Sequence, residues 1–295
     1  MRVVCLYRVE PAGYFGVPDG QKVVLPANAA GVDVLSPTLD TRSGLLVNHG
    51  TLSSFRSDDA AVREEVVLED ARLRFNDEFL TVMVEADSLL AGANAARVHV
   101  TRFLRHLMVA QPDYFRATLM QYEGDSEPVQ IAQPPVRLMN CTLYNLDELR
   151  QRIRLAARRS LTEDTRLMRA LVYYEHARFL LSIRTDLSPP MSAHGRYLLA
   201  SAFLHFWKAI TVVLGDPGTD RDYQRRFRKI GLPANYWKAT VEPLKNVRDD
   251  ADVAHYQLDD EAIGRVEATI PMADSVCRQV LERYSEHLNT GPVAA

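Results

Sequence analysis

The feature that most constrains the fold is the segment 192–214, which reads SAHGRYLLASAFLHFWKAITVVL. Its apolar residues fall on nearly every side of a helix, so other chain segments must cover it on all faces. Gly215 and Pro217 follow it and end the helix. No uninterrupted apolar run approaches the roughly 18 residues that a membrane span requires. We therefore expect a buried central helix in a helical bundle and no membrane segment.

Further helices are predicted around this segment. One covers 145–160, and the next begins at Ser160, which forms a capping-box pattern with Glu163, and ends before the sequence SPP. A short basic helix follows at 219–231, and Pro243 starts or kinks another helix. A last helix begins near Asp259 and is bent at Pro271. The short loops favour antiparallel neighbours, as in a bundle.

The first 85 residues have the character of β-strands instead. Short β-prone runs bounded by Gly, Pro, Asn and Asp lie at 1–9, 21–27, 43–55, 63–75 and 78–86, and they predict a small, mostly antiparallel sheet. A helix is expected over about 88–108, and 111–123 is either a helix or a last strand. We predict an α+β domain over 1–123, a proline-containing linker over 124–144 and an all-α helical bundle over 145–295.

Composition places the protein in an ordinary class. The chain has 295 residues with a net charge of −3, which gives no general attraction to nucleic acid or anionic lipid. Its three cysteines contain no CxxC pair, which is typical of a protein in a reducing compartment. The first residues, MRVVCLYRVE, lack the apolar centre of a signal peptide. We expect a cytoplasmic protein.

The chemistry is concentrated in VRDDADVAHY, residues 247–256. In a helix, Arg248 and His255 lie about 20° apart around the axis and about 10 Å apart along it, so both can reach one phosphodiester. Arginine suits phosphate oxygens, and histidine exchanges protons near neutral pH. Asp252, three residues before His255, could orient the imidazole. In the alternative interpretation, Arg248 and Asp252 only stabilise a helix as an i, i+4 pair, and His255 packs or caps.

This motif resembles that of the HEPN superfamily (higher eukaryotes and prokaryotes nucleotide-binding). The family pattern is an arginine, then four to six residues of which the first is polar, and then a histidine. Here Arg248, Asp249 and His255 match it with six residues between, and the AHY ending also matches. The resemblance covers roughly 145–290, including the apolar helix and the position of the motif just before the last helix. Asp249 departs from the asparagine that often follows the arginine.

The resemblance implies an all-α HEPN-like bundle that forms a homodimer, in which two motifs meet at a composite site. Many members of the family are metal-independent ribonucleases in toxin–antitoxin, defence or RNA-processing systems, whereas others are inactive binding modules. It implies that Arg248, Asp249, Asp252 and His255 form the catalytic site, with Arg248 stabilising the phosphorus centre and His255 transferring a proton. An antitoxin or a sensor protein is a further expected partner.

A basic segment offers a second contact with RNA. Five cations interleave with Tyr223 and Phe227, a pattern that suits a phosphate backbone; they are Arg221, Arg225, Arg226, Arg228 and Lys229. In the alternative interpretation, this is a solvated amphipathic helix with Tyr223, Phe227 and Ile230 facing the core. No pattern for a metal, a nucleotide loop or a cofactor is present. The sequence thus predicts RNA cleavage, or alternatively a non-catalytic dimerisation and nucleotide- or protein-binding module.

Overall fold

The computed structural model divides into two compact units, which are treated separately below. Unit 1 comprises Met1–Leu104 and Phe115–Leu161, and unit 2 comprises Arg105–Tyr114 and Thr162–Ala295. The structure describes residues 1–10, 23–24, 37–39, 46–50, 63–68, 70–76, 79–111, 114–124, 129–131, 139–140, 146–187, 192–233, 235–249 and 259–290. The predicted order, an α+β part followed by a helical part, is confirmed.

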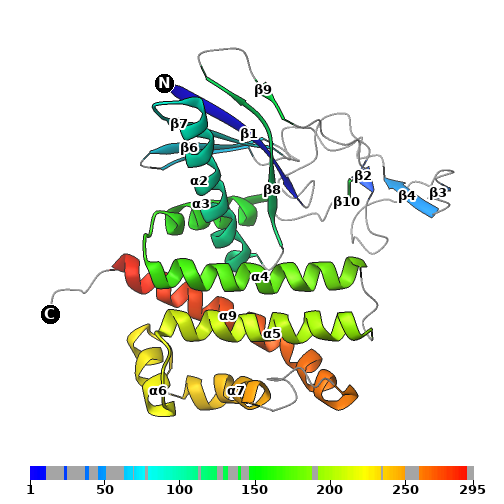
Figure 1. Cartoon of the computed structure of the whole chain (residues 1–295), viewed down its shortest axis with the longest axis vertical. Coiled ribbons are helices and arrows are strands. Elements are labelled where there is room, and N and C mark those ends of the chain that lie inside the picture. Colours follow the sequence, from blue (N-terminus) through cyan, green and yellow to red (C-terminus); the bar gives the residue numbers. More distant parts are fainter. Residues whose placement is uncertain are drawn as a thin grey trace. The chain divides into compact units, whose positions relative to one another are not determined.

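Unit 1 is built on an antiparallel sheet with the strand order β5-β6-β7-β1-β8-β9 (Figure 1). The strands are β1 (Arg2–Glu10), β5 (Arg63–Val67), β6 (Ala71–Asn76), β7 (Phe79–Glu85), β8 (Arg116–Glu123) and β9 (Val129–Gln130). The central strand β1 pairs with β7 on one side and β8 on the other. Its residues Val3, Cys5, Tyr7 and Val9 alternate and are buried, as expected of a strand with one face on a core. The segment 111–123 therefore contains a strand rather than a helix.

A second, short set of strands has the order β10-β2-β4-β3. Its members are β2 (Val23–Val24), β3 (Pro37–Leu39), β4 (Leu46–Gly50) and β10 (Met139–Asn140). Strand β10 pairs in parallel with β2, whereas the other pairs are antiparallel. Strands β2 and β10 lie far apart in the sequence. Their pairing therefore shows that β10, which follows β9, returns to the N-terminal strands.

Helix α3 (Leu146–Ser160) and the part of α2 (Leu89–Ala110) before Arg105 complete unit 1. Helix α2 approaches β1 so closely that a Cβ atom on Gly92 would lie 2.4 Å from Val3, and Phe103 contacts Phe75 of β6 with ring centroids 5.2 Å apart. Helix α3 is tied to β5 by Arg154, which donates a hydrogen bond to Glu64 at 3.0 Å. Our predicted boundary assigned 145–160 to the bundle, but its contacts group α3 with the sheet. Most of the predicted linker, 124–144, lies outside the described residues.

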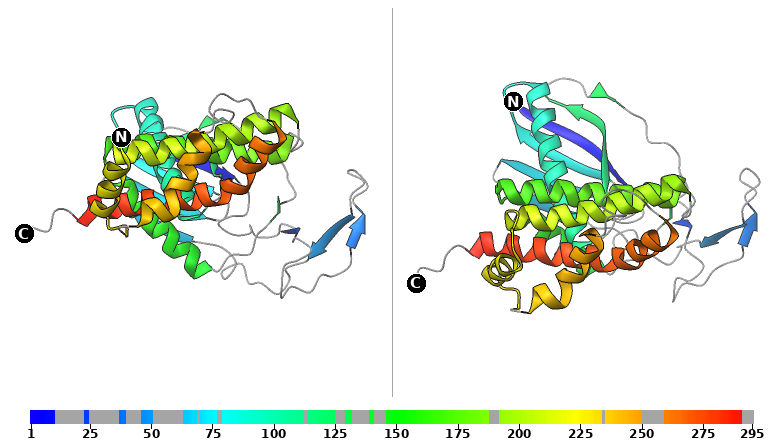
Figure 2. Two further views of the ribbon diagram at one scale, coloured as in Figure 1. Left: turned by 90° about the horizontal axis from the view of Figure 1, so that it is seen from below. Right: turned by 60° about the horizontal axis from the view of Figure 1, so that its bottom comes forward.

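Unit 2 is a set of helices around α5 (Ala193–Leu214). Helix α4 (Thr165–Leu187) and α5 lie side by side, and α9 (Asp260–Thr290) packs against both (Figures 1 and 2). Helices α6 (Asp220–Lys229) and α7 (Glu242–Asp249) also contact α5. The largest side chains of this core are fully buried; they include Tyr174, Phe203, Phe206, Phe227 and Trp237. The predicted central position of 192–214 is confirmed.

The apolar composition of α5 has a second consequence. Its stretch His194–Leu214 is long and apolar enough to cross a membrane by length and composition, contrary to our count of uninterrupted runs. Two thirds of the most apolar window (67%) is, however, buried against the other helices, as in the core helix of a bundle. Burial within the protein therefore accounts for its composition.

The ends of α5 follow the sequence signals. Ser192 accepts a hydrogen bond from the backbone N–H of Gly195, and Gly215 adopts a left-handed conformation with φ of 75°. The backbone N–H groups of Gly215 and Asp216 donate to Val212 and Thr211, which is the Schellman arrangement. Asp216 itself has a φ of 51°, a value that non-glycine residues adopt infrequently. The chain thus turns sharply after α5 and delivers Asp216 and the start of α6 beside it.

One predicted helix start is wrong. Helix α4 begins at Thr165, and its cap is Asp164, which accepts a hydrogen bond from the N–H of Leu167 at 2.8 Å. Ser160 instead ends α3, where its hydroxyl donates to the carbonyl of Ala157. The capping-box pattern at Ser160 and Glu163 therefore does not start the helix.

The chain enters α7 through a π-helical turn, η1 (Trp237–Val241). The N–H of Glu242 donates to the carbonyl of Trp237, five residues back, rather than to the residue four back. Pro243 comes directly afterwards and has no N–H for the carbonyl that an α-helix would pair with it. The wide turn accommodates this proline and presents Trp237 to Tyr223 of α6, which stacks on it with ring centroids 4.1 Å apart. Pro243 is the second residue of α7, which follows the π-helical turn without a break, so this proline lies inside a continuous helical segment rather than at its start.

Candidate functional site

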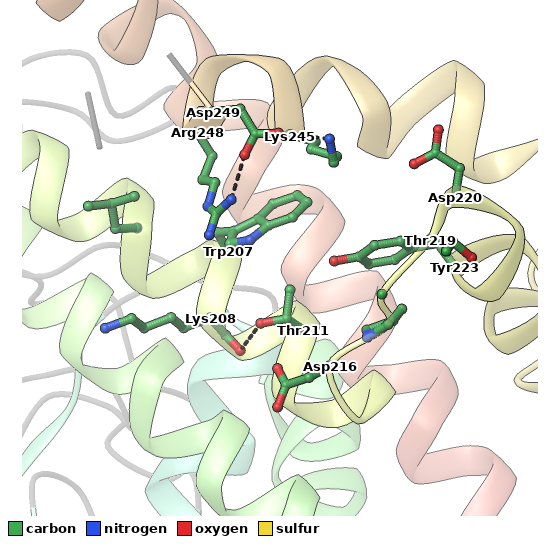
Figure 3. Close-up of a pocket in the computed structure, with 13 residues that line it drawn as sticks. Trp207, Lys208, Thr211, Asp216, Thr219, Asp220, Tyr223, Lys245, Arg248 and Asp249 are labelled. Carbon is green, nitrogen blue, oxygen red and sulfur yellow. Dashed lines mark hydrogen bonds and ion pairs between the residues drawn. The ribbon is translucent and has the colours of Figure 1, made fainter. Parts of the chain in front are cut away.

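Arg248 lines a surface cavity of unit 2 with a volume of about 810 Å³ (Figure 3). Three elements form it. Helix α5 contributes one wall, the turn after α5 with the start of α6 contributes a second, and the end of α7 contributes a third. The lining residues are Leu204, Trp207, Lys208, Thr211, Asp216, Pro217, Gly218, Thr219, Asp220, Tyr223, Lys245, Arg248 and Asp249.

The floor of the cavity is aromatic. Tyr223 lies between Trp237, on which it stacks at 17°, and Trp207, whose ring centroid is 6.2 Å away. In Figure 3 the hydroxyl end of Tyr223 points toward the side of the cavity that Trp207 and Thr211 line. Burial raises the pKa of Tyr223 to about 12, although the nearby Arg248 opposes the shift. The hydroxyl is therefore neutral at physiological pH and can both donate and accept a hydrogen bond.

The ion pairs of α7 occupy the end of the cavity. Asp249 accepts hydrogen bonds from Arg248 at 2.5 Å and from Lys245 at 2.7 Å. Burial raises the pKa of the Asp249 carboxyl, but the bonds from Lys245 and Arg248 outweigh burial and hold the pKa below its usual value. The bond to Asp249 also raises the pKa of Lys245. This three-residue cluster is charged throughout the physiological range.

The cavity as a whole is electrically balanced. Its cations are Lys208, Lys245 and Arg248, and its acids are Asp216, Asp220 and Asp249. A phosphate group that enters must therefore compete with carboxylates that already interact with the cations. The guanidinium of Arg248 nevertheless stays accessible, because 48% of its side chain is exposed.

The other predicted catalytic residues divide between described and undescribed positions. Asp249 accepts a hydrogen bond from the adjacent Arg248, so the two side chains form an ion pair. Asp252 and His255 lie outside the described residues, because the structure describes α7 only to Asp249 and resumes at Asp259. The predicted approach of Arg248 to His255 therefore stays a prediction.

The predicted basic segment forms α6, and its two faces separate as an amphipathic helix requires. Tyr223, Phe227 and Ile230 are buried, and Arg221, Arg228 and Lys229 are exposed. Arg225 pairs with Asp222 at 2.7 Å. Arg226 donates to the carbonyls of Leu214 and Gly215, so it closes the C-terminal end of α5. Arg226 thus has a structural role, and RNA binding by the other four cations stays a prediction.

The sequence did not direct attention to Lys208, Lys245 or Trp207 as cavity residues. Lys208 is one of two Lys or Arg residues in an apolar helix, and Lys245 comes three residues before Arg248. The spacing of Lys245 and Arg248 on one helix face was the available signal. Only the packing of α7 against α5 shows that Lys208 lines the same cavity as Arg248.

A second cavity of about 590 Å³ adjoins the first, because Asp216 lines both. It lies between the start of α4 and the end of α5, and its lining residues are Arg166, Arg169, Val172, Tyr173, Val212, Gly215 and Asp216. Among the described residues, no group of three His, Cys, Asp or Glu side chains is arranged to hold a metal ion.

The arrangement of the first cavity, with an accessible guanidinium, two lysines and an aromatic floor, suits an anionic ligand that carries a planar group. Comparisons of the chain with protein-family models, with curated proteins and with solved structures returned no match.

Proposed function

We propose that this protein is a HEPN-like ribonuclease, or an effector derived from one, that acts on RNA without a metal ion at a composite site in a homodimer. The observation that carries the proposal is the position of Arg248, the first residue of the motif, whose half-exposed guanidinium lines the 810 Å³ cavity. A stress or defence system is the proposed setting, and unit 1 would sense a signal or select the target.

The proposed chemistry is transesterification within RNA. The 2′-oxygen attacks the adjacent phosphorus while the 5′-oxygen leaves, which gives a 2′,3′-cyclic phosphate and a free 5′-hydroxyl. His255 would accept the proton of the 2′-hydroxyl or supply the proton of the leaving oxygen. Arg248 would stabilise the charge that develops on the phosphoryl oxygens, for which it must first leave Asp249.

A second candidate is a non-catalytic module that binds a nucleotide or a protein and dimerises. One observation favours it. Asp249 holds Arg248 and Lys245 at 2.5 and 2.7 Å, and the cavity contains as many acids as cations. An arginine that stays paired would contribute to binding but would not stabilise a transition state.

RNA digestion in EDTA separates the two candidates. The full chain is incubated with end-labelled single-stranded RNA, alongside Arg248→Ala, His255→Ala and the control Arg283→Ala. Arg283 is equally exposed, at 52%, but pairs with Glu286 on α9 away from the cavity residues. We expect the wild type and the control to release products with a 2′,3′-cyclic phosphate, and both motif variants to release at least about 100-fold less.

Thermal unfolding of each variant provides the folding control. An RNA whose 2′-hydroxyls are replaced by hydrogen should stay intact, because the nucleophile is absent. A wild type that leaves RNA intact, or motif variants that cleave as fast as the wild type, would rule out the ribonuclease and favour the binding module.

A further inference from the structure

The two adjoining cavities of unit 2 differ in whether their cations form ion pairs with carboxylates. In the first, Lys245 and Arg248 both interact with Asp249. In the second, Arg166 and Arg169 are exposed, and neither forms an ion pair with another residue that the structure describes. The second cavity therefore offers two guanidinium groups without a carboxylate partner among the described residues, and Asp216 is the one acid in its lining.

Lys208 links the two cavities. It lines the first, and its ammonium lies over the ring of Tyr173, a residue of the second cavity, at 5.7 Å from the ring centroid. In Figure 3 the Lys208 side chain extends away from Tyr223, the floor of the first cavity. A ligand that extends from one cavity into the other would therefore pass close to the ammonium of Lys208.

The combined charge favours a polyanion. The first cavity is balanced, and the second adds Arg166 and Arg169 but no new acid, since Asp216 is shared. The two cavities together thus have an excess of two positive charges. The net charge of the whole chain is −3, so this excess is local and not a general property of the surface.

The aromatic residues and the cavity sizes favour a single strand over a duplex. The half-buried Tyr173 lines the second cavity, so this cavity combines two cations with a partly exposed ring, whereas Tyr223 of the first cavity is buried and stacked on Trp237. Proteins bind single-stranded nucleic acids by such combinations, since bases stack on aromatic rings while cations contact the backbone. Cavities of about 810 and 590 Å³ have the size of sites for individual nucleotides.

The guanidinium of Arg166 lies close to Gly215. A Cβ atom on Gly215 would lie 3.0 Å from Nη1 of Arg166 and 2.8 Å from Nη1 of Arg226. Arg226 is already bonded to the carbonyl of Gly215 at 2.6 Å. The absence of a side chain at 215 therefore leaves room for both guanidinium groups at the end of α5.

We infer that the second cavity is a binding subsite for single-stranded RNA, in which Arg166 and Arg169 hold a backbone phosphate next to the nucleotide in the Arg248 cavity. Tyr173 supports the adjoining base, and Lys208 contacts the backbone between the two. This inference rests on the proposed function for the class of its ligand, but not on cleavage.

The test uses a ligand that cannot be cleaved. Binding of a fluorescent 2′-O-methyl oligonucleotide of about 12 nucleotides to the full chain is measured by anisotropy over a range of salt concentrations. We expect Arg166→Ala/Arg169→Ala to bind at least about tenfold more weakly than the wild type. Its log Kd should also depend less on log salt concentration, by about 0.7, because the contact with one phosphate is lost. The double variant Arg166→Lys/Arg169→Lys should regain most of the affinity, and Arg283→Ala should bind as the wild type does.

Three results would overturn the inference: unchanged affinity in the alanine variant, equal affinity for the same sequence as a duplex, or equal competition by polyglutamate. Because Arg166 lies against Gly215, the alanine variant is also compared by thermal unfolding, and Arg169→Glu provides a second test that leaves Arg166 intact. Loss of binding in both variants from a wild type that does not cleave RNA supports the subsite and rejects the ribonuclease. Cleavage by the wild type with undiminished binding in both variants does the reverse.

Discussion

At the scale of single residues, the most informative position is Asp249. It follows Arg248 in the motif and interacts with both Arg248 and Lys245, so it occupies the cations that an incoming phosphate would contact. A carboxylate in this place acts as an internal competitor for anions. In both proposed functions, we therefore expect this side chain to influence how readily the first cavity accepts an anion.

Replacing Asp249 by asparagine should strengthen anion binding. The change removes a negative charge and frees Lys245 and Arg248, so we expect affinity for the uncleavable oligonucleotide to rise roughly threefold to tenfold at low salt. The matched control is Glu261→Gln, which removes the partner of Arg265, also held at 2.7 Å, on α9. Equal affinity in Asp249→Asn and the wild type would show that the carboxylate does not compete.

His205 gives a residue-scale prediction about pH. Burial lowers the pKa of His205 below 6.5; the bond to the Ser201 carbonyl opposes this shift, whereas Lys208 and His176 add to it. Because the folded protein prefers the neutral ring, its full stability is present above pH 6.5 and declines as the pH falls through the lowered pKa. In urea titrations, the stability advantage of the wild type over His205→Asn should shrink between about pH 7.5 and about pH 5.5. Parallel losses in both proteins would contradict this assignment.

At the scale of elements, α4 and α9 are joined by a buried polar contact as well as by apolar packing. The hydroxyl of Tyr174 donates to Asp274 at 2.9 Å, and Tyr174 is fully buried. Arg178 and Arg278 lie 3.5 and 3.7 Å from the same carboxylate. Together these polar contacts help to orient two long helices.

Removing the hydroxyl should weaken this contact without creating a cavity. In Tyr174→Phe the buried Asp274 loses a donor, so we expect the free energy of unfolding to fall by about 1–3 kcal/mol. Tyr173→Phe is the control, since the neighbouring Tyr173 is only half-buried. Urea denaturation followed by circular dichroism measures both variants, and equal midpoints would contradict the stated role of the hydroxyl.

At the scale of the whole molecule, the proposed activity depends on association. A single chain contributes one Arg248 and one His255, whereas the composite site requires two motifs that meet. Light scattering coupled to gel filtration should therefore give twice the chain mass of 33.3 kDa at micromolar concentration. A strict monomer at every concentration would remove the basis for the ribonuclease.

Several elements could be predicted because their signals are local. The segment 192–214 is apolar on all faces, and α5 occupies 193–214 with Gly215 in the left-handed conformation that ends it. The alternation of Val3, Cys5, Tyr7 and Val9 likewise identified a strand with one buried face. Signals of this kind depend on neighbours within a few residues, which the sequence specifies directly.

Other features could not be predicted because they depend on partners distant in the chain. The amphipathic pattern of α3 indicates that one face is buried, but not that Arg154 pairs with Glu64 of β5 rather than with a helix of the bundle. Ser160 and Asp164 both belong to residue types that cap helices. Only the structure shows that Asp164 caps α4, whereas Ser160 is buried at the end of α3.

The sequence by itself determined the α+β and helical parts and the central helix, since periodicity is a property of short segments. Tertiary structure decided that Lys208, Tyr223 and Arg248 line one cavity and that Arg166 lies beside Gly215. A cavity forms where separate helices meet, and the packing of their side chains sets which residues face it.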